Sequence, residues 1–306
     1  MNTEITRHAS RALADAPEAD DLNRLFESSK APETRRVYAT AVRQWTAFAK
    51  ERGIAPLPAR PIEVALWVAH MRRSGKSLST ARTMLSGLGK AHDLSGMDNP
   101  VKTLEVRTAV EGYARECGAE QKQAEGLTLG ALTAFETHAP PLDTAIVRVM
   151  RDAMLRRSEA AALTWGDLEP MHDGSGRLTV RRSKTDQQGE GAVQYLSPAT
   201  MRAVAVIAPL EPQPTDSLFG LSGQRISARI KRIAEAAGLG SEFSGHSCRV
   251  GMAQDLAASG VELPALMTAG RWKSPKTAAK YTRNESAGRG AVARFYGAAQ
   301  PRQEGT

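Results

Sequence analysis

Side chains spread over the second half of the chain have the types that phosphoryl transfer needs. They include a phenol that can act as a nucleophile, two guanidinium groups that can bind one phosphate, a lysine that can donate a proton, and an imidazole. These roles need no metal ligand, and we expect neither a metal site nor a cofactor. The set consists of Arg156, Lys184, His246, Arg249, Trp272 and Tyr281.

Two members of this set, His246 and Arg249, lie three residues apart in the sequence. On a helix, side chains at this spacing emerge on one face about one turn apart, so both can meet the same phosphate. The alternative is a histidine that starts a helix and an arginine that faces solvent. Residues 246–249 taken alone favour this alternative. The presence of the other members of the set favours the interpretation that both side chains bind one phosphate.

Arg156 follows an apolar run and precedes Arg157 and Ser158. Two arginines at the end of a segment that is expected to be buried indicate a functional role. The alternative is that the pair is simply solvated, as an isolated Arg-Arg pair usually is. Ser158 is expected to cap a short helix that starts at Glu159. Glu159 either orients a cationic group by a charge-assisted hydrogen bond or complements the helix dipole as a first-turn acid.

The three remaining members each have a functional and a simpler interpretation. Lys184 lies near the turn of a predicted hairpin, where it is either a loop residue or the proton donor to a leaving oxygen, a role worth roughly 100- to 10,000-fold in rate. Trp272 either donates a hydrogen bond or packs in a core. Tyr281 is either an amphipathic helix residue or a nucleophile whose phenolate the cations Lys280 and Arg283 favour.

The first part of the chain is predicted to be a small helical bundle. Apolar residues recur every three or four positions over residues 34–52, which is typical of an amphipathic helix. Pro61 suits the first turn of a second helix, a third starts near Ser79, and a fourth contains Val106. A polar stretch then predicts a linker. The expected parts are a mobile arm at residues 1–30, the bundle at 31–115, the linker at 116–125 and a second domain at 126–306.

The second domain is predicted to be α+β, mainly helical with a small β-hairpin. Apolar residues at 142–153 line a helix that is expected to reach Arg156. Alternation at residues 178–182 and 193–195, on either side of a glycine-containing loop, predicts the hairpin. Further helices are expected after Pro198, at residues 201–207, 226–237, 246–259, 263–269 and 275–283.

The composition suits a globular protein with a polyanionic partner. The chain has 306 residues, enough for two domains, and 41% of them are hydrophobic. The formal net charge is +8, and lysine and arginine gain affinity by displacing counterions from phosphates. Cys117 and Cys248 are not in metal-like spacing, which favours a reducing cytoplasm. Residues 1–31 contain no continuous apolar run, so we expect neither a signal peptide nor a membrane anchor.

These residues together resemble the tyrosine recombinase (phage integrase) family, and within it the Cre-like branch. The resemblance begins near Thr34 and is strongest at residues 244–251, 265–272 and 281–284. Many family members have histidine where this chain has Trp272, and tryptophan there is typical of the Cre-like branch. Met154 stands where the wider family has a glycine. This departure bears on the backbone geometry expected between Met154 and Arg156.

The resemblance implies a helical core-binding (SAM-like) DNA-binding domain followed by an integrase-type catalytic domain, and it implies a role for each candidate residue. The implied set is Arg156 and Arg249 as the pair that binds the scissile phosphate, Lys184 as general acid, His246 as phosphate-binding histidine and assisting base, Tyr281 as nucleophile, Glu159 as the acidic residue behind them, and Trp272 in place of the family's histidine.

The implied reaction is attack of the tyrosine on a DNA phosphodiester, which gives a 3′-phosphotyrosyl link and a free 5′-hydroxyl. Two such strand exchanges, through a Holliday junction, complete recombination without ATP or an external metal. The implied partners are double-stranded DNA with inverted-repeat sites and three further copies of the chain. A C-terminal helix around residues 291–296 is apolar enough to join the copies in this tetramer.

DNA contacts outside the catalytic set are expected on helices of both domains. The resemblance implies a major-groove reader at the start of the third helix and a second reading helix near residue 225. Arginine can bind guanine through two hydrogen bonds, although phosphate contact and plain solubility are the alternatives. The predicted DNA-contacting residues are Arg36, Ser79, Thr80, Arg82, Thr83, Arg225 and Arg229.

Two alternative functions remain open at this point. A type IB topoisomerase shares the phosphate chemistry but relaxes supercoils without a specific site, and it lacks such an N-terminal bundle. A DNA-binding protein of the same fold that has lost catalysis is the other alternative, although every expected catalytic position is filled. We expect a protein of the bacterial cytoplasm, encoded by a chromosome, phage or plasmid, whose target site and accessory proteins the sequence does not specify.

Overall fold

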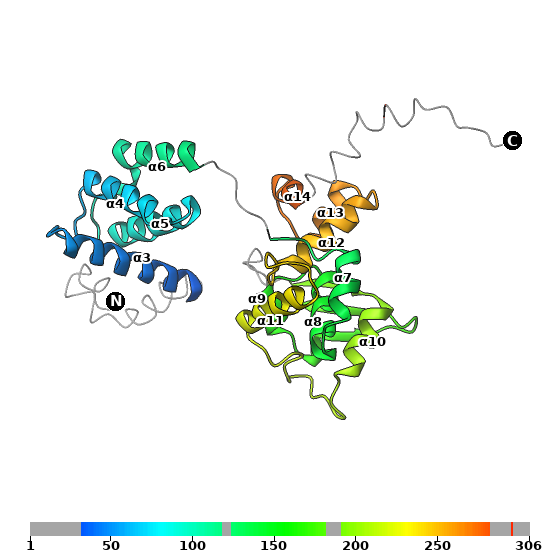
Figure 1. Ribbon diagram of the computed structural model, residues 1–306. Coiled ribbons are helices and arrows are strands. Elements are labelled where there is room, and N and C mark those ends of the chain that lie inside the picture. Colours follow the sequence, from blue (N-terminus) through cyan, green and yellow to red (C-terminus); the bar gives the residue numbers. More distant parts are fainter. Residues whose placement is uncertain (1–31, 118–123, 182–190, 282–294, 296–306) are drawn as a thin grey trace. The chain divides into compact units, whose positions relative to one another are not determined.

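The computed structural model describes residues 32–117, 124–181, 191–281 and residue 295 (Figure 1). The chain divides into two compact units, Met1–Lys122 and Gln123–Thr306. Each unit has its own hydrophobic core. The predicted arm at residues 1–30 and residues 118–123 of the predicted linker lie outside the described residues.

The described part of the N-terminal unit is a bundle of helices. Helix α5 packs against α3, and α6 packs against α4. The four α-helices lie where the sequence predicts them, to within a few residues at each end. The elements are α3 (Pro32–Glu51), α4 (Pro61–Arg73), α5 (Leu78–Leu94), the 3₁₀-helix η2 (Pro100–Lys102) and α6 (Leu104–Cys117).

Aromatic side chains join α3 to α4 in the core of this unit. Trp45 and Trp67 meet edge to face with ring centroids 5.4 Å apart, and Phe48 stacks on Trp45 at 5.6 Å. The indole of Trp45 donates a hydrogen bond of 2.6 Å to the carbonyl of Pro56, so its polar group is satisfied inside the core. The aromatic rings therefore fill the space between α3 and α4.

The C-terminal unit packs helices around a small antiparallel sheet. Strand β2 lies between β1 and β3, and Val180 at the end of β2 pairs with Ala192 at the start of β3. The elements are α7 (Leu129–Glu136), α8 (Pro141–Asp152), α9 (Arg157–Ala162), the 3₁₀-helix η3 (Trp165–Asp167), β1 (Leu168–Pro170), β2 (Gly176–Val180), β3 (Ala192–Leu196), α10 (Pro198–Val206), α11 (Gly223–Ala236), α12 (Ser247–Ala258), α13 (Leu263–Gly270) and α14 (Pro275–Tyr281).

Helix α8 is the central element of this unit. It contacts α9, α10, α11 and α12, and strand β3 packs against it (Figure 1). Its apolar side chains Ile146, Val149 and Met150 are fully buried, which matches the apolar face that the sequence predicts. Helices α12, α13 and α14 also contact one another. Met154, two residues after the end of α8, belongs to one apolar cluster with Leu266 of α13 and Ala278 of α14.

The predicted fold class, mainly helical with a small sheet, is confirmed. Helix α7 and strand β1 were not predicted. Two local predictions are wrong: α8 ends at Asp152 instead of reaching Arg156, and α9 begins at Arg157, with Arg156 and not Ser158 at its N-cap. The cause is Met154, whose left-handed backbone (φ 46°) ends the helical path.

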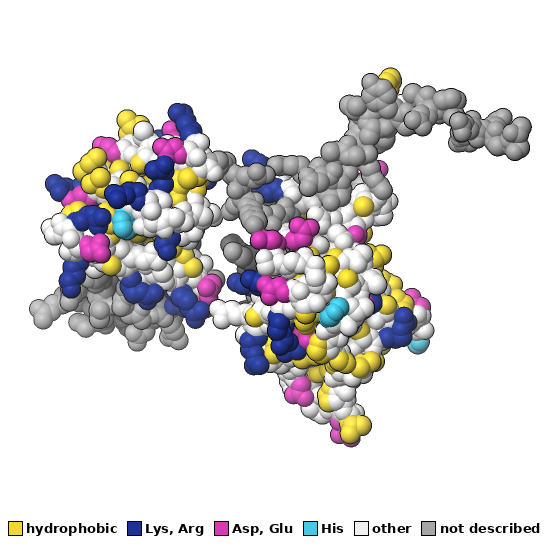
Figure 2. Space-filling model, in the orientation of Figure 1, with side chains coloured by type: hydrophobic (Ala, Val, Ile, Leu, Met, Phe, Trp, Pro, Cys, Tyr) yellow, Lys and Arg dark blue, Asp and Glu magenta, His cyan; other side chains and the backbone are white. Residues whose placement is uncertain are grey.

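Basic side chains are prominent on the surface of both units. Lys and Arg side chains gather over the region of α11 in the C-terminal unit and are spread over the visible face of the N-terminal unit (Figure 2). Within the described residues, no helix combines the length and the apolar character that crossing a membrane requires. Nor does the described part of the chain bring three or more His, Cys, Asp or Glu side chains together as a metal site.

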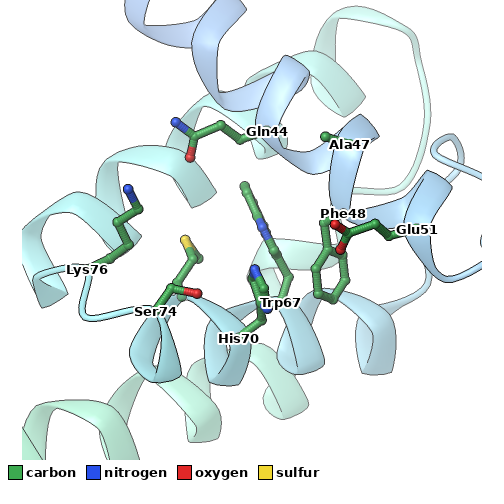
Figure 3. A pocket seen from close by; sticks show the side chains of 9 residues that line it. Gln44, Ala47, Phe48, Glu51, Trp67, His70, Ser74 and Lys76 are labelled. Atoms are coloured by element: carbon green, nitrogen blue, oxygen red, sulfur yellow. The ribbon is translucent and has the colours of Figure 1, made fainter.

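A hollow of about 200 Å³ lies between α3 and α4 of the N-terminal unit. Phe48 and Glu51 of α3 face Trp67 and His70 of α4 across it, and Lys76 stands at its rim (Figure 3). The lining mixes aromatic rings with ionisable groups. It contains none of the candidate catalytic residues, all of which belong to the C-terminal unit.

The two cysteines of the chain lie in opposite environments. Cys117 is exposed at the end of α6, whereas Cys248 is fully buried in α12, and both are free thiols. Burial raises the pKa of the Cys248 thiol to about 12. The thiol therefore stays protonated and unreactive at neutral pH.

Candidate active site

A tight turn between α8 and α9 places Arg156. Met154 takes the left-handed conformation, which is uncommon for a residue with a side chain. Its side chain is buried in a small cluster with Leu266, Trp272 and Ala278, and this packing stabilises the turn. The chain leaves α8 abruptly, so Arg156 lies at the start of α9 with its guanidinium partly exposed.

Glu159 fixes the orientation of Arg156. The carboxylate is buried, with 5% of the residue exposed. Its Oε2 accepts the backbone N–H of Arg156 at 2.9 Å, and its Oε1 accepts Nη1 of the same residue at 2.7 Å. Both interpretations of Glu159 therefore hold together: it is a first-turn acid that caps α9, and it orients a guanidinium by a charge-assisted hydrogen bond.

Arg249 is a buried cation, with only 1% of the residue exposed. Its Nη1 donates to the carbonyl of Met154 and its Nη2 to the carbonyl of Gly270. Burial, followed by the charges of Arg156 and Arg271, lowers its pKa to about 10, so it remains protonated at neutral pH. The alternative of a solvent-facing arginine does not hold.

His246 and Tyr281 form a hydrogen-bonded pair. His246 is the N-cap residue of α12 and Tyr281 is the last residue of α14. The imidazole Nε2 and the phenol Oη lie 2.9 Å apart. Burial, followed by the charges of Arg249 and Arg156, lowers the pKa of His246 to about 4. The imidazole is therefore neutral at pH 7 and can accept the proton of the phenol.

Trp272 packs between the candidate nucleophile and the buried arginine. Its ring stacks on that of Tyr281, with centroids 4.9 Å apart and planes 13° apart. The guanidinium carbon of Arg249 lies 4.8 Å from the centroid of Trp272, which is cation–π distance. Gly270 allows this arrangement, because a Cβ there would lie 2.4 Å from the indole ring. Of the two interpretations, the packing role is the one that the contacts support.

Arg271 is a residue of the site that the sequence analysis missed. It has a left-handed backbone (φ 51°) between α13 and α14. Its Nη1 donates to the carbonyl of Ala153 at 2.8 Å, and its Nη2 donates to Glu159 at 2.6 Å. The available signal was an arginine between Gly270 and Trp272, at a point where the chain has to turn between two helices.

Two predicted features lie outside the described residues. Lys184 belongs to residues 182–190, so its role stays a prediction. Arg181, the last described residue before this segment, is held by a hydrogen bond. Its Nε donates to the buried Asp167 at 2.6 Å. The predicted C-terminal helix around residues 291–296 is outside as well, apart from Phe295, which is exposed.

The predicted DNA-contacting residues of α5 lie at its exposed start. Ser77 caps the helix by accepting the backbone N–H of Thr80 at 3.1 Å, and its hydroxyl lies 2.9 Å from that of Thr80. Ser79, Arg82 and Thr83 are exposed, and Thr80 is half-buried. Ser79, Arg82 and Thr83 are spaced three and four residues apart, so they lie on one face of α5. Whether they contact DNA stays a prediction.

The predicted contacts on α3 and α11 differ in their surroundings. Arg36 and Arg225 are exposed. Arg229 instead forms a bidentate pair with the buried Asp143 of α8, with both N···O distances 2.6 Å, which raises its pKa. Arg229 therefore ties α11 to α8. Arg225, Arg229 and Arg232 line a shallow basic surface on α11 (Figure 2).

Comparison with known families identifies the class of protein. Residues 120–287 match the model of the phage integrase family. The match covers more than half of the 306 residues and includes every candidate catalytic position. The chain therefore belongs to the phage integrase family, and the predicted membership is confirmed.

Individual relatives agree with this assignment. The chain is 23% identical to the recombinase Cre of Escherichia phage P1 over 298 residues, covering 86% of this chain and 87% of Cre. It is 26% identical to an integrase/recombinase XerD homolog of Selenomonas ruminantium over 285 residues, covering 84% and 83%. A Tn1549 transposon integrase in complex with transposon DNA shares the fold, with a TM-score of 0.62 at 12% identity over 90% of this chain and 98% of that chain.

Proposed function

We propose that the protein is a site-specific DNA recombinase that cleaves and rejoins DNA through a 3′-phosphotyrosyl intermediate. The observation that carries this proposal is the hydrogen bond between a neutral His246 and the hydroxyl of Tyr281, next to two anchored arginines. A nucleophile in contact with a base, beside cations that can bind a phosphate, is the arrangement that covalent phosphoryl transfer needs. Membership of the phage integrase family supports the same reaction.

Cleavage begins with attack of the Tyr281 Oη on the phosphorus. The bond from Oη to phosphorus forms while the bond from phosphorus to the 5′-oxygen breaks, and the phenol proton passes to Nε2 of His246. Lys184 donates a proton to the leaving 5′-oxygen. The positive charges of Arg156 and Arg249 stabilise the negative charge that grows on the phosphoryl oxygens. The reaction needs no ATP, because the phosphotyrosyl link conserves the energy of the phosphodiester.

Rejoining reverses this step with the 5′-hydroxyl of a second duplex. Two rounds of exchange, through a Holliday junction, recombine two sites bound by four copies of the chain, which the helix predicted around residues 291–296 would join. A XerH recombinase of similar fold (TM-score 0.59, 18% identity over 78% of this chain and 73% of that chain) is bound to a palindromic substrate, which supports an inverted-repeat site here. The exposed start of α5 and the basic surface on α11 supply the DNA contacts.

Two alternatives use the same fold differently. A type IB topoisomerase would form the same covalent link but would relax supercoiled DNA of any sequence. A DNA-binding protein without catalysis would not need a base hydrogen-bonded to Tyr281, so the pair that His246 forms disfavours it. The requirement for a specific site is what separates recombinase from topoisomerase.

The decisive experiment first selects a preferred inverted-repeat site from a random DNA library. A nicked suicide substrate with this site is then incubated with the protein and examined by denaturing electrophoresis. We expect a covalent adduct with the wild type and none with Tyr281→Phe, which lacks only the nucleophilic oxygen and should bind the site nearly as well. An adduct with Tyr281→Phe would place the nucleophile elsewhere, and equal relaxation of plasmids with and without the site would favour the topoisomerase.

A further inference from the structure

Arg271 shares an acceptor with each of the two phosphate-binding arginines. The carboxylate of Glu159 accepts both Arg156 and Arg271, at 2.7 and 2.6 Å. The carbonyl of Met154 accepts both Arg249 and Arg271, the latter at 3.3 Å. The two arginines that would bind the phosphate are therefore connected by a continuous chain of hydrogen bonds with Arg271 in the middle.

The backbone of Arg271 adds a second connection. Arg271 directly precedes Trp272, whose ring stacks on Tyr281 and lies against Arg249. Its side chain is tied to the end of α8 through the carbonyl of Ala153. A side chain fixed on α8 and α9 thus holds the segment that leads to the nucleophile. The left-handed backbone at Arg271 is what turns the side chain back toward α8 while the chain continues to Trp272.

We propose that Arg271 is a positioning residue that couples the two phosphate-binding arginines to the segment carrying Trp272 and Tyr281. The inference rests on the proposed function for its catalytic meaning. Arg271 touches neither Tyr281 nor the site of the phosphate in the contacts described, so it acts through Arg156, Arg249 and Trp272.

The charges of the site give Arg271 a second effect. Glu159 carries one negative charge and has two guanidinium partners. Its charge is therefore shared, and Arg156 keeps part of its positive charge for an incoming phosphate. Without Arg271, the carboxylate would neutralise Arg156 alone. Burial lowers the pKa of Arg271, and the adjacent Glu159 acts against this shift and keeps the guanidinium charged.

The first arm of the test needs no DNA. The contribution of Trp272 to the near-ultraviolet circular dichroism is measured as the difference between each protein and the same protein with Trp272→Phe. Arg271→Gly suits the left-handed backbone and removes only the side chain. We expect it to reduce the Trp272 contribution by about half or more, because the ring loses its fixed position. An unchanged contribution overturns the proposal.

Arg148→Ala is the matched control. Arg148 pairs with Glu136 at 2.5 Å in the same unit, so its loss also removes a partly buried ion pair. It should lower the melting temperature without changing the Trp272 signal. A reduction of the signal equal to that of Arg271→Gly would mean that the effect is a general loss of stability. Arg271→Gln, which keeps an amide donor, replaces Arg271→Gly in every comparison if the glycine variant does not fold.

The second arm measures cleavage of the suicide substrate at increasing protein concentration. We expect Arg271→Gly to lower the rate constant at saturation by roughly tenfold to 100-fold, with DNA affinity changed by less than about threefold. In an Arg156→Ala background, the same change should lower the rate by a smaller factor than in the wild type, because the part of its effect that acts through Arg156 is already lost, whereas the parts that act through Arg249 and Trp272 remain. A rate within threefold of the wild type, or effects that multiply, overturns the proposal.

The two arms separate the failure of this inference from that of the proposed function. If the wild type forms no covalent adduct with any selected site, the proposed function fails, and the circular dichroism still decides whether Arg271 positions Trp272. If the wild type forms the adduct and both arms show no effect of Arg271→Gly, the function stands and the inference fails.

Discussion

At the scale of single residues, Arg156 and Arg249 should matter more for the rate of cleavage than for DNA affinity. Arg156→Ala and Arg249→Ala are each expected to cost about 2.7 to 4 kcal/mol in the transition state, which is roughly 100- to 1000-fold in rate. Single-turnover trapping on the suicide substrate and equilibrium binding measure the two effects. Losses of equal size in rate and affinity would identify the arginines as ordinary phosphate contacts.

The same two substitutions should differ in stability. Arg249 is buried and donates to the carbonyls of Met154 and Gly270, so its removal takes the side-chain donor from the Gly270 carbonyl and leaves the Met154 carbonyl with Arg271 alone. Arg156 is partly exposed and its loss leaves Glu159 with Arg271 as partner. Arg249→Ala should therefore lower the melting temperature more than Arg156→Ala.

His246 should make the stability of the protein depend on pH. Its pKa is about 4 in the folded protein and about 6.5 in the unfolded chain, so the unfolded chain binds a proton first as the pH falls. The contribution of the neutral imidazole is complete above about pH 6.5 and is lost progressively toward pH 4. Urea unfolding of the wild type and His246→Gln at about pH 7.5 and about pH 5 measures this, and the wild type should lose more stability. A difference between the proteins that is the same at both pH values would contradict a neutral His246.

Residue types predicted which side chains the described site brings together, among them Arg249, His246 and Tyr281, but not how the site is held together. A phenol, an imidazole and two arginines with suitable spacing could be recognised along the chain, because their roles follow from their functional groups. The partners of Arg271 and Arg229 come from segments more than 80 residues away in sequence. No periodicity records such contacts, so Arg271 was missed and the pair between Arg229 and Asp143 was not foreseen.

At the scale of elements, the close contact between α12 and the segment before α7 should be sensitive to one methyl group. A Cβ on Gly251 would lie 2.0 Å from the carbonyl oxygen of Leu127, which is backbone and cannot move alone. Gly251→Ala should therefore push α12 away and destabilise the unit by about 1 to 3 kcal/mol. Chemical denaturation measures the loss.

Gly130→Ala is the matched control for this substitution. Gly130 lies on helix α7 of the same unit, and a Cβ there meets nothing within 4 Å. Alanine has the higher helix propensity, so this variant should be at least as stable as the wild type. If both variants lost stability to the same extent, the contact at Gly251 would not be the cause.

Helices were predicted well where a long apolar face had to be buried, as in α3 and α8. The carboxyl end of α8 and the start of α9 were predicted wrongly. The apolar pattern continues through Met154, whereas the helical backbone ends before it. The left-handed conformation of Met154 is stabilised by tertiary packing with Leu266 and Trp272, which local propensity cannot show. Strand β1 has only three residues and gives no alternation to detect.

At the scale of the whole molecule, the net charge of +8 should make DNA binding strongly dependent on salt. The logarithm of the affinity is expected to fall linearly with the logarithm of the salt concentration, with a slope of about −0.9 for each phosphate contact. Arg82→Ala on α5 and Arg225→Ala on α11 should each reduce this slope by about one if they contact phosphate. If they contact a base, they should instead relax specificity at one position, with a cost of about 1 to 3 kcal/mol.

Arg177→Ala is the control for these measurements. Arg177 is an exposed arginine of β2 that was not predicted to contact DNA, and it lies 3.7 Å from Glu169. Its loss lowers the net charge by the same amount as the other two substitutions. A slope that changes equally in all three variants would show that total charge, and not a contact at α5 or α11, sets the salt dependence.

The different environments of the two cysteines should allow a dye to be attached to Cys117 alone. Because Cys248 is buried with a pKa of about 12, a maleimide dye at neutral pH should attach only to Cys117, with no mutagenesis. The dye would stand at the carboxyl end of α6, the last described residue of the N-terminal unit. Paired with an acceptor dye on DNA, it would report by energy transfer when this unit binds DNA, without any change to the sequence.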